Sequence, residues 1–525
     1  MIKITALTVA FIAFLIFLGF YVVPQQGGLN SSTELSVNEL SGVSPTYEEK
    51  LPIQEVDLGS QGRSIFIAFV MLSHVLLANL HLGGSWIAVI TASIYLRTRK
   101  ERLNRLARSI TLFNVILFSA GATFAAAGVV FFISLFPVFA ENAFHIYWWP
   151  LFVEAILFAV EIFFLYTFWF SWGKIRDSFH QLLGYGYALS VFLQTLMINT
   201  IAAGMLTPGG GSINWGDTGI LTMSLNDLLS WWNNATVWFL QFHRLAASVS
   251  YFGFILVALA MFHFLDRKDS ASKMYWDWVG SYGMAWGLLG LVFQPGIGLM
   301  YMLAIQQNEP AAFTMIMHGP RAWEMLLMVG LLSALVISNI IYFLDRREKI
   351  LSEHESRTIY AIMRIFLGLA VIAALILISP SWIGSTIRGG PGSVIIPFGL
   401  MIYKYMALII MVVIGSVVLT VDVFILGDLK ESDWGNIPKS ARYAGIFSSV
   451  MGMWLVITMG FVRESARSPW LIYNIIPVPG QMNYPTPIAF GSIIALWLII
   501  MAITLTVFWF VSKVTAEHPE SAEEV

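Results

Sequence analysis

Residues 451–470 read MGMWLVITMGFVRESARSPW, an apolar run that ends in a glutamate, two arginines and the pair Pro-Trp. A membrane span needs about 20 mostly apolar residues, and the run together with the residues before it meets that length. The charged residues at its end either belong to a helix end in water or form a site. Which interpretation is right depends on the rest of the chain.

The composition is that of a polytopic membrane protein. Of the 525 residues, 58% are hydrophobic and 11% are charged, whereas soluble domains carry about 25% charged residues. The formal net charge of -2 gives no indication of nucleic-acid binding. The chain has no cysteine, which excludes disulfides, Cys-ligated iron–sulfur clusters and C-x-x-C-H heme attachment. A bound metal or heme must be held by His, Met, Glu or Asp.

Hydropathy predicts an all-α transmembrane bundle of about twelve helices. The expected spans are 4–23, 65–95, 109–136, 149–172, 182–206, 236–264, 275–304, 321–342, 358–379, 396–426, 445–462 and 489–511.

The distribution of Lys and Arg predicts the orientation of these spans. Basic loops at 97–108, 174–176, 266–273, 345–349 and 430–442 alternate with poorly charged ones, which places the basic loops and the N-terminus on the cytoplasmic side.

This orientation divides the chain into four parts. We expect a membrane anchor at 1–23, an extracytoplasmic segment at 24–62, a transmembrane bundle at 63–512 and a cytoplasmic tail at 513–525. The first span lacks a clear A-x-A cleavage site, which favours a retained anchor over a cleaved signal peptide.

Two histidines lie on nearly one face of the second span. His74 and His81 are seven residues, or two helical turns, apart. Polar groups at membrane depth are usually functional or internally paired. A neutral imidazole ligates heme iron, and hydrogen bonding to a neighbouring helix is the alternative for His74. For His81 that alternative is favoured, because one helix rarely supplies two axial ligands to one heme.

A histidine and a methionine on different helices form a second candidate pair. His243, followed by Arg244, and Met406 lie at similar depth near the external ends of their spans. Together they fit a low-spin heme, although with 23 methionines in the chain Met406 alone is better explained as core packing. Arg244 suits a heme propionate or a lipid phosphate.

Glu154 and Glu161 are also seven residues apart on one helix face, and Glu161 lies near mid-membrane. Buried carboxylates pair, stay protonated or relay protons, so a proton path and a structural pair both remain open. Glu464 lies at roughly the depth of His74 and His243, with Arg467 and Trp470 after it. Candidate ligands from four helices therefore converge on the outer leaflet, where arginines would neutralise propionates.

These positions resemble subunit I of the cytochrome bd oxidases. The motif Glu-x-x-Arg-x-Pro-Trp appears as Glu464-Ser-Ala-Arg467-Ser-Pro469-Trp470, with Ala466 and Ser468 where the family usually has Gly and Gln. The first core helix of the family is matched by Arg63, Phe66, His74 and Gly83, and its fourth helix by residues 194–209. The family's paired carboxylates are similar to Glu154 and Glu161, whose spacing differs by one residue.

The resemblance implies a function in the cytoplasmic (inner) membrane of a prokaryote. His243 and Met406 would hold a low-spin heme b, and His74 and Glu464 would serve one or two high-spin hemes of b or d type. Electrons would pass from the low-spin to the high-spin hemes, and dioxygen would be reduced to water with protons delivered past Glu161. Family members also pair with a second, similar membrane subunit, so a subunit resembling subunit II is expected besides the lipid bilayer.

The chain departs from the family where quinol is oxidised. Family members have a long external loop before the Met-bearing helix, whereas residues 321–379 read here as two extra spans. The resemblance therefore covers about 63–300 and 396–512, and the donor is either quinol or another redox protein. Two alternatives remain: a non-catalytic heme b subunit that anchors a larger redox complex, and a transporter with broken helices.

Overall fold

The computed structural model describes residues 59–208, 232–266, 270–317, 322–353, 357–378, 402–428 and 434–477, with scattered positions between 498 and 510. The predicted segments 1–23 and 513–525, most of 24–62 and nearly all of the last span, 489–511, lie outside these residues.

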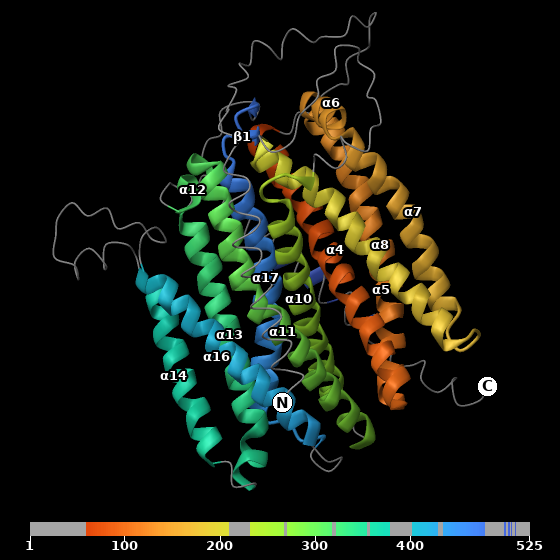
Figure 1. Cartoon of the computed structure of the whole chain (residues 1–525), viewed down its shortest axis with the longest axis vertical. Coiled ribbons are helices and arrows are strands. Elements are labelled where there is room, and N and C mark those ends of the chain that lie inside the picture. The colour runs from red at the N-terminus through yellow and green to blue at the C-terminus, as the bar shows by residue number, and fades with distance from the viewer. Residues whose placement is uncertain are drawn as a thin grey trace, which may run out of the picture.

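The described part of the chain is a bundle of α-helices with one small hairpin (Figure 1). The first six helices are α4 (Gly59–Thr98), α5 (Glu101–Leu135), α6 (Pro137–Ile146), α7 (Trp148–Phe170), α8 (Asp177–Leu206) and α10 (Val237–Asp266). They are followed by α11 (Ser270–Asn308), α12 (Pro310–Met317), α13 (Ala322–Glu353), α14 (Arg357–Ile378), α16 (Ile402–Asp428) and α17 (Lys439–Ala466). Strands β1 (Trp470–Ile472) and β2 (Ile476–Pro477) form an antiparallel pair.

The predicted fold class is confirmed. Within the described residues nine helices are long and apolar enough to cross a membrane, and α16 contributes a shorter apolar segment, Met406–Val418. The chain is therefore a multi-pass membrane protein. Helices α13 and α14 fill the interval where residues 321–379 predict two extra spans. The hydropathy pattern did not predict α6 and α12, because helices of 10 and 8 residues are too short to cross a bilayer.

Short connections between α4 and α5 and between α7 and α8 make these spans antiparallel, and the bundle has two distinct ends. The turns after α4 and after α7 carry Arg99, Lys100, Lys174 and Arg176 at one end, which we call the basic end. Helices α6 and α12 and strand β1 lie at the opposite end, the hairpin end (Figure 1). At the basic end, the guanidinium carbons of Arg102 and Arg105 lie 4.8 and 4.3 Å from the centres of the Trp278 and Tyr275 rings of α11.

Helix α10 lies against α4, α11 and α17 in the core of the bundle. Glycines permit the close approach of these helices. A Cβ on Gly83 of α4 would collide with the Ser248 carbonyl oxygen of α10, and one on Gly253 of α10 would lie 2.7 Å from the Gly283 oxygen of α11. Small residues in this role are typical of membrane helix interfaces.

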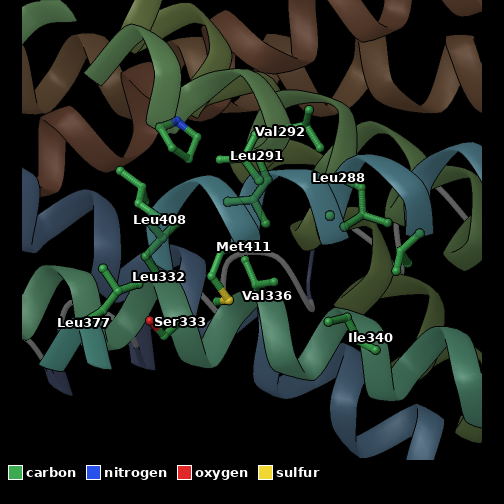
Figure 2. Close-up of a pocket in the computed structure, with 14 residues that line it drawn as sticks. Leu288, Leu291, Val292, Leu332, Ser333, Val336, Ile340, Leu377, Leu408 and Met411 are labelled. Atoms are coloured by element: carbon green, nitrogen blue, oxygen red, sulfur yellow. The ribbon is translucent and has the colours of Figure 1, made fainter. Parts of the chain in front are cut away.

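The region around α11, α13, α14 and α16 is apolar. It contains a cavity of about 20 Å³, whose lining residues include Leu288, Val336, Leu377 and Met411 (Figure 2). Ser333 is the one polar side chain in the lining, and its hydroxyl donates to the Val329 carbonyl oxygen at 2.8 Å. A cavity without charges or convergent polar groups does not suit a heme or quinol headgroup, so the candidate site lies elsewhere.

Candidate functional site

The last turn of α17 holds a carboxylate between two guanidiniums. Glu464 accepts a hydrogen bond from Arg463 at 2.8 Å through Oε1 and another from Arg467 through Oε2. The side chain of Arg467 is 9% exposed and that of Glu464 is 46% exposed. Glu464 is therefore held as an anion, but nearly half of its side chain is still accessible to a ligand.

The hairpin fixes the position of this cluster. Arg467 also donates to the Leu471 carbonyl oxygen, and the backbone N–H of Trp470 donates to the Arg467 carbonyl oxygen at 2.7 Å. The backbone N–H of Tyr473 bonds to the Met205 carbonyl oxygen of α8 at 2.9 Å. The cluster of Glu464, Arg467 and Trp470 that the motif predicts is thus tied to two helices.

Buried polar neighbours of this cluster were not predicted from the sequence. Ser465 donates to Glu324 Oε2 at 2.5 Å, and Glu324 is buried in the first turn of α13. The sequence analysis assigned both arginines to propionates, but it did not predict the direct contact of Arg463 with Glu464. A carboxylate in the first turn of an apolar span was the available signal for Glu324, since polar groups at membrane depth are paired.

His74 has the environment of a histidine that ligates a metal. Its Nδ1–H donates to the Gly121 carbonyl oxygen of α5 at 3.0 Å. The lone pair of Nε2 can therefore bind a metal. Metal-ligating histidines usually donate their other ring N–H to a carbonyl or carboxylate, which fixes the tautomer and the ring orientation. His74 therefore fits an axial ligand.

Arg244 of α10 belongs to a network of neutral amides. Its guanidinium donates to Asn79 Oδ1 at 3.1 Å and to Asn199 Oδ1 at 2.7 Å, and Asn199 donates to Gln241 at 2.6 Å. No carboxylate contacts Arg244 among the described residues. A charged group at this depth needs compensation, so Arg244 suits an anionic ligand.

His243 and Met406 lie on helices that both pack against α11. His243 Nε2 lies 3.1 Å from where a Cβ on Gly298 would be, and its ring centre is 6.5 Å from that of Tyr301. Met406 is 52% exposed, near the start of α16. The pairing of these two residues stays a prediction.

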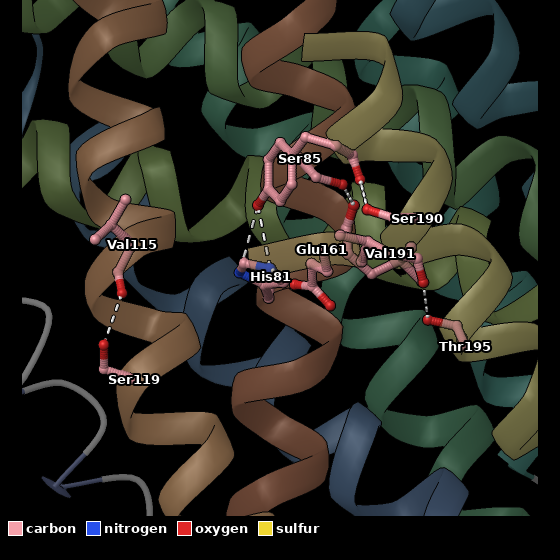
Figure 3. Close-up of polar contacts among 10 residues, drawn as sticks. His81, Ser85, Val115, Ser119, Glu161, Ser190, Val191 and Thr195 are labelled. Carbon is pink, nitrogen blue, oxygen red and sulfur yellow. Dashed lines mark hydrogen bonds and ion pairs between the residues drawn. The ribbon is translucent and has the colours of Figure 1, made fainter. Parts of the chain in front are cut away.

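His81 and Glu161 are in direct contact, from α4 and α7 (Figure 3). His81 Nε2 lies 2.5 Å from Glu161 Oε1 and 3.2 Å from the Tyr187 hydroxyl of α8. The three residues are 6%, 1% and 0% exposed. The partner of His81 was not predicted from the sequence. Glu154 lies two turns before Glu161 on α7 and is half-buried.

The donor set fits a heme better than a bare metal ion. Among the described residues, no three His, Cys, Asp or Glu side chains gather to hold an ion. A porphyrin supplies four ligands to its iron, so one imidazole or carboxylate from the protein is sufficient. His74 and Glu464 offer such single ligands. Arg244, Arg463 and Arg467 supply three positive charges against the two carboxylates of Glu464 and Glu324. This excess suits the carboxylate groups of a porphyrin.

The fold and these side chains define an all-α integral membrane protein with candidate single-residue heme ligands. The model of the family described as cytochrome bd terminal oxidase subunit I matches residues 63–332, just over half of the chain. The chain therefore belongs to the cytochrome bd terminal oxidase subunit I family, and the resemblance drawn from the motifs is confirmed. The matched range includes His74, Glu154, Glu161 and His243.

A solved structure extends the likeness in fold beyond this range. The bd oxidase from Geobacillus thermodenitrificans is similar with a TM-score of 0.51 and 14% sequence identity, over 87% of this chain and 98% of that chain. No curated protein matches the sequence. Membership of the family makes this chain a heme-bearing membrane subunit of an oxidoreductase class, the terminal oxidases.

Proposed function

We propose that the protein is the subunit of a bd-type terminal oxidase in which dioxygen is reduced to water. The observation that carries this proposal is the accessible carboxylate of Glu464 between Arg463 and Arg467. A structural ion pair at a helix end does not need a second guanidinium, whereas an anionic iron ligand beside the porphyrin carboxylates does.

The residues divide into two sets of ligands. His243 and Met406 would hold a low-spin heme b, and His74 and Glu464 would each hold a high-spin heme of b or d type. Bound heme supplies the electron transfer and the reduction of oxygen. The protein fixes the tautomer of His74 through the Gly121 carbonyl and keeps Glu464 ionised. Arg467 and Trp470 would hold the anionic edge of the cofactor.

Protons would come from the basic end, which the positive-inside rule assigns to the cytoplasm. Glu161 and Glu154 lie along α7, about 10 Å apart for seven helical residues at 1.5 Å each. The ligands His74 and Glu464 lie toward the hairpin end, so a proton from the cytoplasm passes Glu161 before it reaches them. In this orientation the heme ligands would lie near the outer face of a prokaryotic cytoplasmic membrane.

Two features of the bundle, the helices α13 and α14 and the outward face of α7, bear on the electron donor and the partner subunit. Helices α13 and α14 fill the interval where the family has its quinol-oxidising loop, so the donor is either quinol or another redox protein. The outward face of α7 is a shallow apolar surface that includes Phe152, Ile156 and Phe163. It suits lipid or a second membrane subunit resembling subunit II.

Heme content and carbon monoxide binding test this proposal. A pyridine hemochrome assay on the purified complex should detect heme, and the reduced protein should bind carbon monoxide at a high-spin heme. Met406→Leu should change the low-spin spectrum and leave carbon monoxide binding intact. Absence of heme would overturn the proposal, and an unchanged spectrum in Met406→Leu would overturn the pairing of His243 with Met406.

A non-catalytic heme b subunit is the second candidate. The presence of α13 and α14 in the interval of the quinol loop favours it, because an electron conduit needs no quinol site of its own. In that case all hemes would be six-coordinate, and the reduced protein would not bind carbon monoxide.

A further inference from the structure

His81 and Glu161 form a buried pair that the heme ligands do not explain. Their contact joins α4 and α7 at 2.5 Å, with both side chains at least nine-tenths buried. Glu161 Oε2 is buried and has no hydrogen-bond partner among the described residues. No guanidinium or ammonium group contacts the pair there, so its charge is set by protons alone.

The groups in contact with the pair are otherwise neutral, and Glu154, two turns away on α7, is a carboxylate whose charge acts on Glu161. Tyr187 of α8 contacts both ring nitrogens of His81, at 3.2 and 3.5 Å, and α5 presents the ring of Phe118 at 5.8 Å. The Asn114 amide of α5 lies over Gly84 and interacts with the Tyr187 hydroxyl.

Two charged side chains of α10 and α17, Arg244 and Arg463, form hydrogen bonds with residues other than His81 and Glu161. Arg244 of α10 bonds to Asn79 and Asn199, and Arg463 of α17 bonds to Glu464. Among the described residues, Glu161 and Tyr187 are the titratable groups in contact with His81.

We propose that His81, Glu161 and Tyr187 form a proton-holding unit that supplies the oxygen-reduction site, with His81 as the partner that shares the proton of Glu161. With a neutral imidazole and a carboxylate the pair has a charge of -1. Addition of one proton gives imidazolium with carboxylate, or imidazole with carboxylic acid, and a net charge of zero. Because an uncompensated charge is costly at this depth, the pair rests with the proton bound and is refilled after each release.

The position of the unit fits a supply role, given the proposed oxidase function on which this inference rests. Helices α4 and α7 run in the same direction, from the hairpin end to the basic end (Figure 1). His81 therefore lies two turns, about 10 Å, closer to the basic end than the candidate iron ligand His74. Glu161 has the same displacement from Glu154. The unit thus lies between the basic end and the heme ligands.

A double-mutant cycle tests the unit in the intact purified complex. The variants are His81→Gln, Glu161→Gln and the double substitution, in which two amides can still hydrogen-bond and leave no buried charge. His180→Gln is the matched control, because His180 of α8 is hydrogen-bonded to Ser171 and makes no hydrogen bond to a carboxylate among the described residues. The measurements are heme content, carbon monoxide binding, oxygen consumption against pH, its solvent isotope effect and the carboxyl infrared band.

We expect His81→Gln to lower turnover at least about tenfold, since positioned proton transfer contributes about 10²–10⁴-fold. The Michaelis constant for oxygen, the heme content and carbon monoxide binding should not change, while the isotope effect rises and the carboxyl band of Glu161 shifts. The double variant should lose no more activity than either single variant, because the two residues act as one unit. His180→Gln should behave like the wild type.

Three outcomes would contradict the proposed proton-holding unit. In the first, His81→Gln keeps the wild-type turnover and isotope effect. In the second, the two losses multiply in the double variant, so that the residues act independently. In the third, His81→Gln loses a heme and His81 is an iron ligand. Lack of carbon monoxide binding in the wild type would instead overturn the oxidase function itself, so the two failures are distinguishable.

Discussion

Two glutamates in this bundle have opposite environments. Glu464 accepts hydrogen bonds from Arg463 and Arg467 and is 46% exposed, whereas Glu161 contacts the imidazole of His81 and is 1% exposed. Guanidiniums stay charged at any physiological pH, so they fix the charge of Glu464. The imidazole of His81 is not a permanent cation and can share a proton with the carboxylate of Glu161. The first carboxylate suits an iron ligand and the second suits a proton donor.

The largest effect on oxygen consumption and heme content is expected from removal of the guanidinium of Arg467. Arg467→Met leaves Glu464 with one cation and removes the bond to the Leu471 carbonyl oxygen. Changes in the partners of a metal ligand cost about 10–100-fold in affinity or activity, so oxygen consumption and heme content should fall in that range. The matched control is Arg463→Met, whose side chain is 31% exposed and should matter less. Equal losses in the two variants would contradict the assigned role of Arg467.

A smaller effect, on stability, is expected at the other carboxylate. His81→Leu leaves Glu161 without its partner, and an unsatisfied buried polar group costs about 2 kcal/mol. The thermal midpoint of the purified protein should fall, and the combination His81→Leu with Glu161→Leu should restore most of the loss, because it removes both polar groups. If the double variant is less stable than His81→Leu, the contact at 2.5 Å is not what makes the single variant unstable.

A spectral change without loss of stability is expected at Gly298, which lies beside the candidate ligand His243. A Cβ on Gly298 would lie 3.1 Å from His243 Nε2, whereas one on Gly415 would meet only Val292, at 3.7 Å. Gly298→Ala should therefore cause a small but measurable shift of the low-spin heme spectrum by tilting the imidazole, and Gly415→Ala should not. An unchanged spectrum in Gly298→Ala would argue against His243 as a ligand.

The smallest effect concerns a third carboxylate, outside the spans. Burial raises the pKa of Glu309, between α11 and α12, to about 7. The folded chain then holds one more proton than the unfolded chain between about pH 4.3 and 7, so stability falls as the pH rises through that range. Because Glu309 is only half-buried, the loss should be about 1 kcal/mol after solvent screening. Glu309→Gln should abolish this dependence in thermal denaturation, and a steeper fall with pH in the variant would contradict it.

The spans and the cluster of Glu464 and Arg467 could be predicted from the sequence, because their signals are local. Runs of about 20 apolar residues predict a span, and Glu464 and Arg467 are three residues apart on one helix, so their contact follows from helical spacing. The family resemblance followed from the same local motifs. Helices α6 and α12, which begin at Pro137 and Pro310, gave no such signal, because they are too short to cross a membrane.

The contact of His81 with Glu161 was not readable in this way. The seven-residue spacings of His74 with His81 and of Glu154 with Glu161 identify two faces on two helices. The contact between those faces depends on how α4 and α7 are arranged in the bundle, which periodicity within one helix does not encode. The amide partners of Arg244 were missed for the same reason, since Asn79 and Asn199 come from two other helices.

Heme stoichiometry in the wild type and in Glu464→Ala, measured side by side with the spin state of the iron, tests the central claim most directly. The account predicts that the wild type contains both low-spin and high-spin heme, and that Glu464→Ala loses one high-spin equivalent and keeps the low-spin signal. Equal heme content and equal spin states in the two proteins would contradict it.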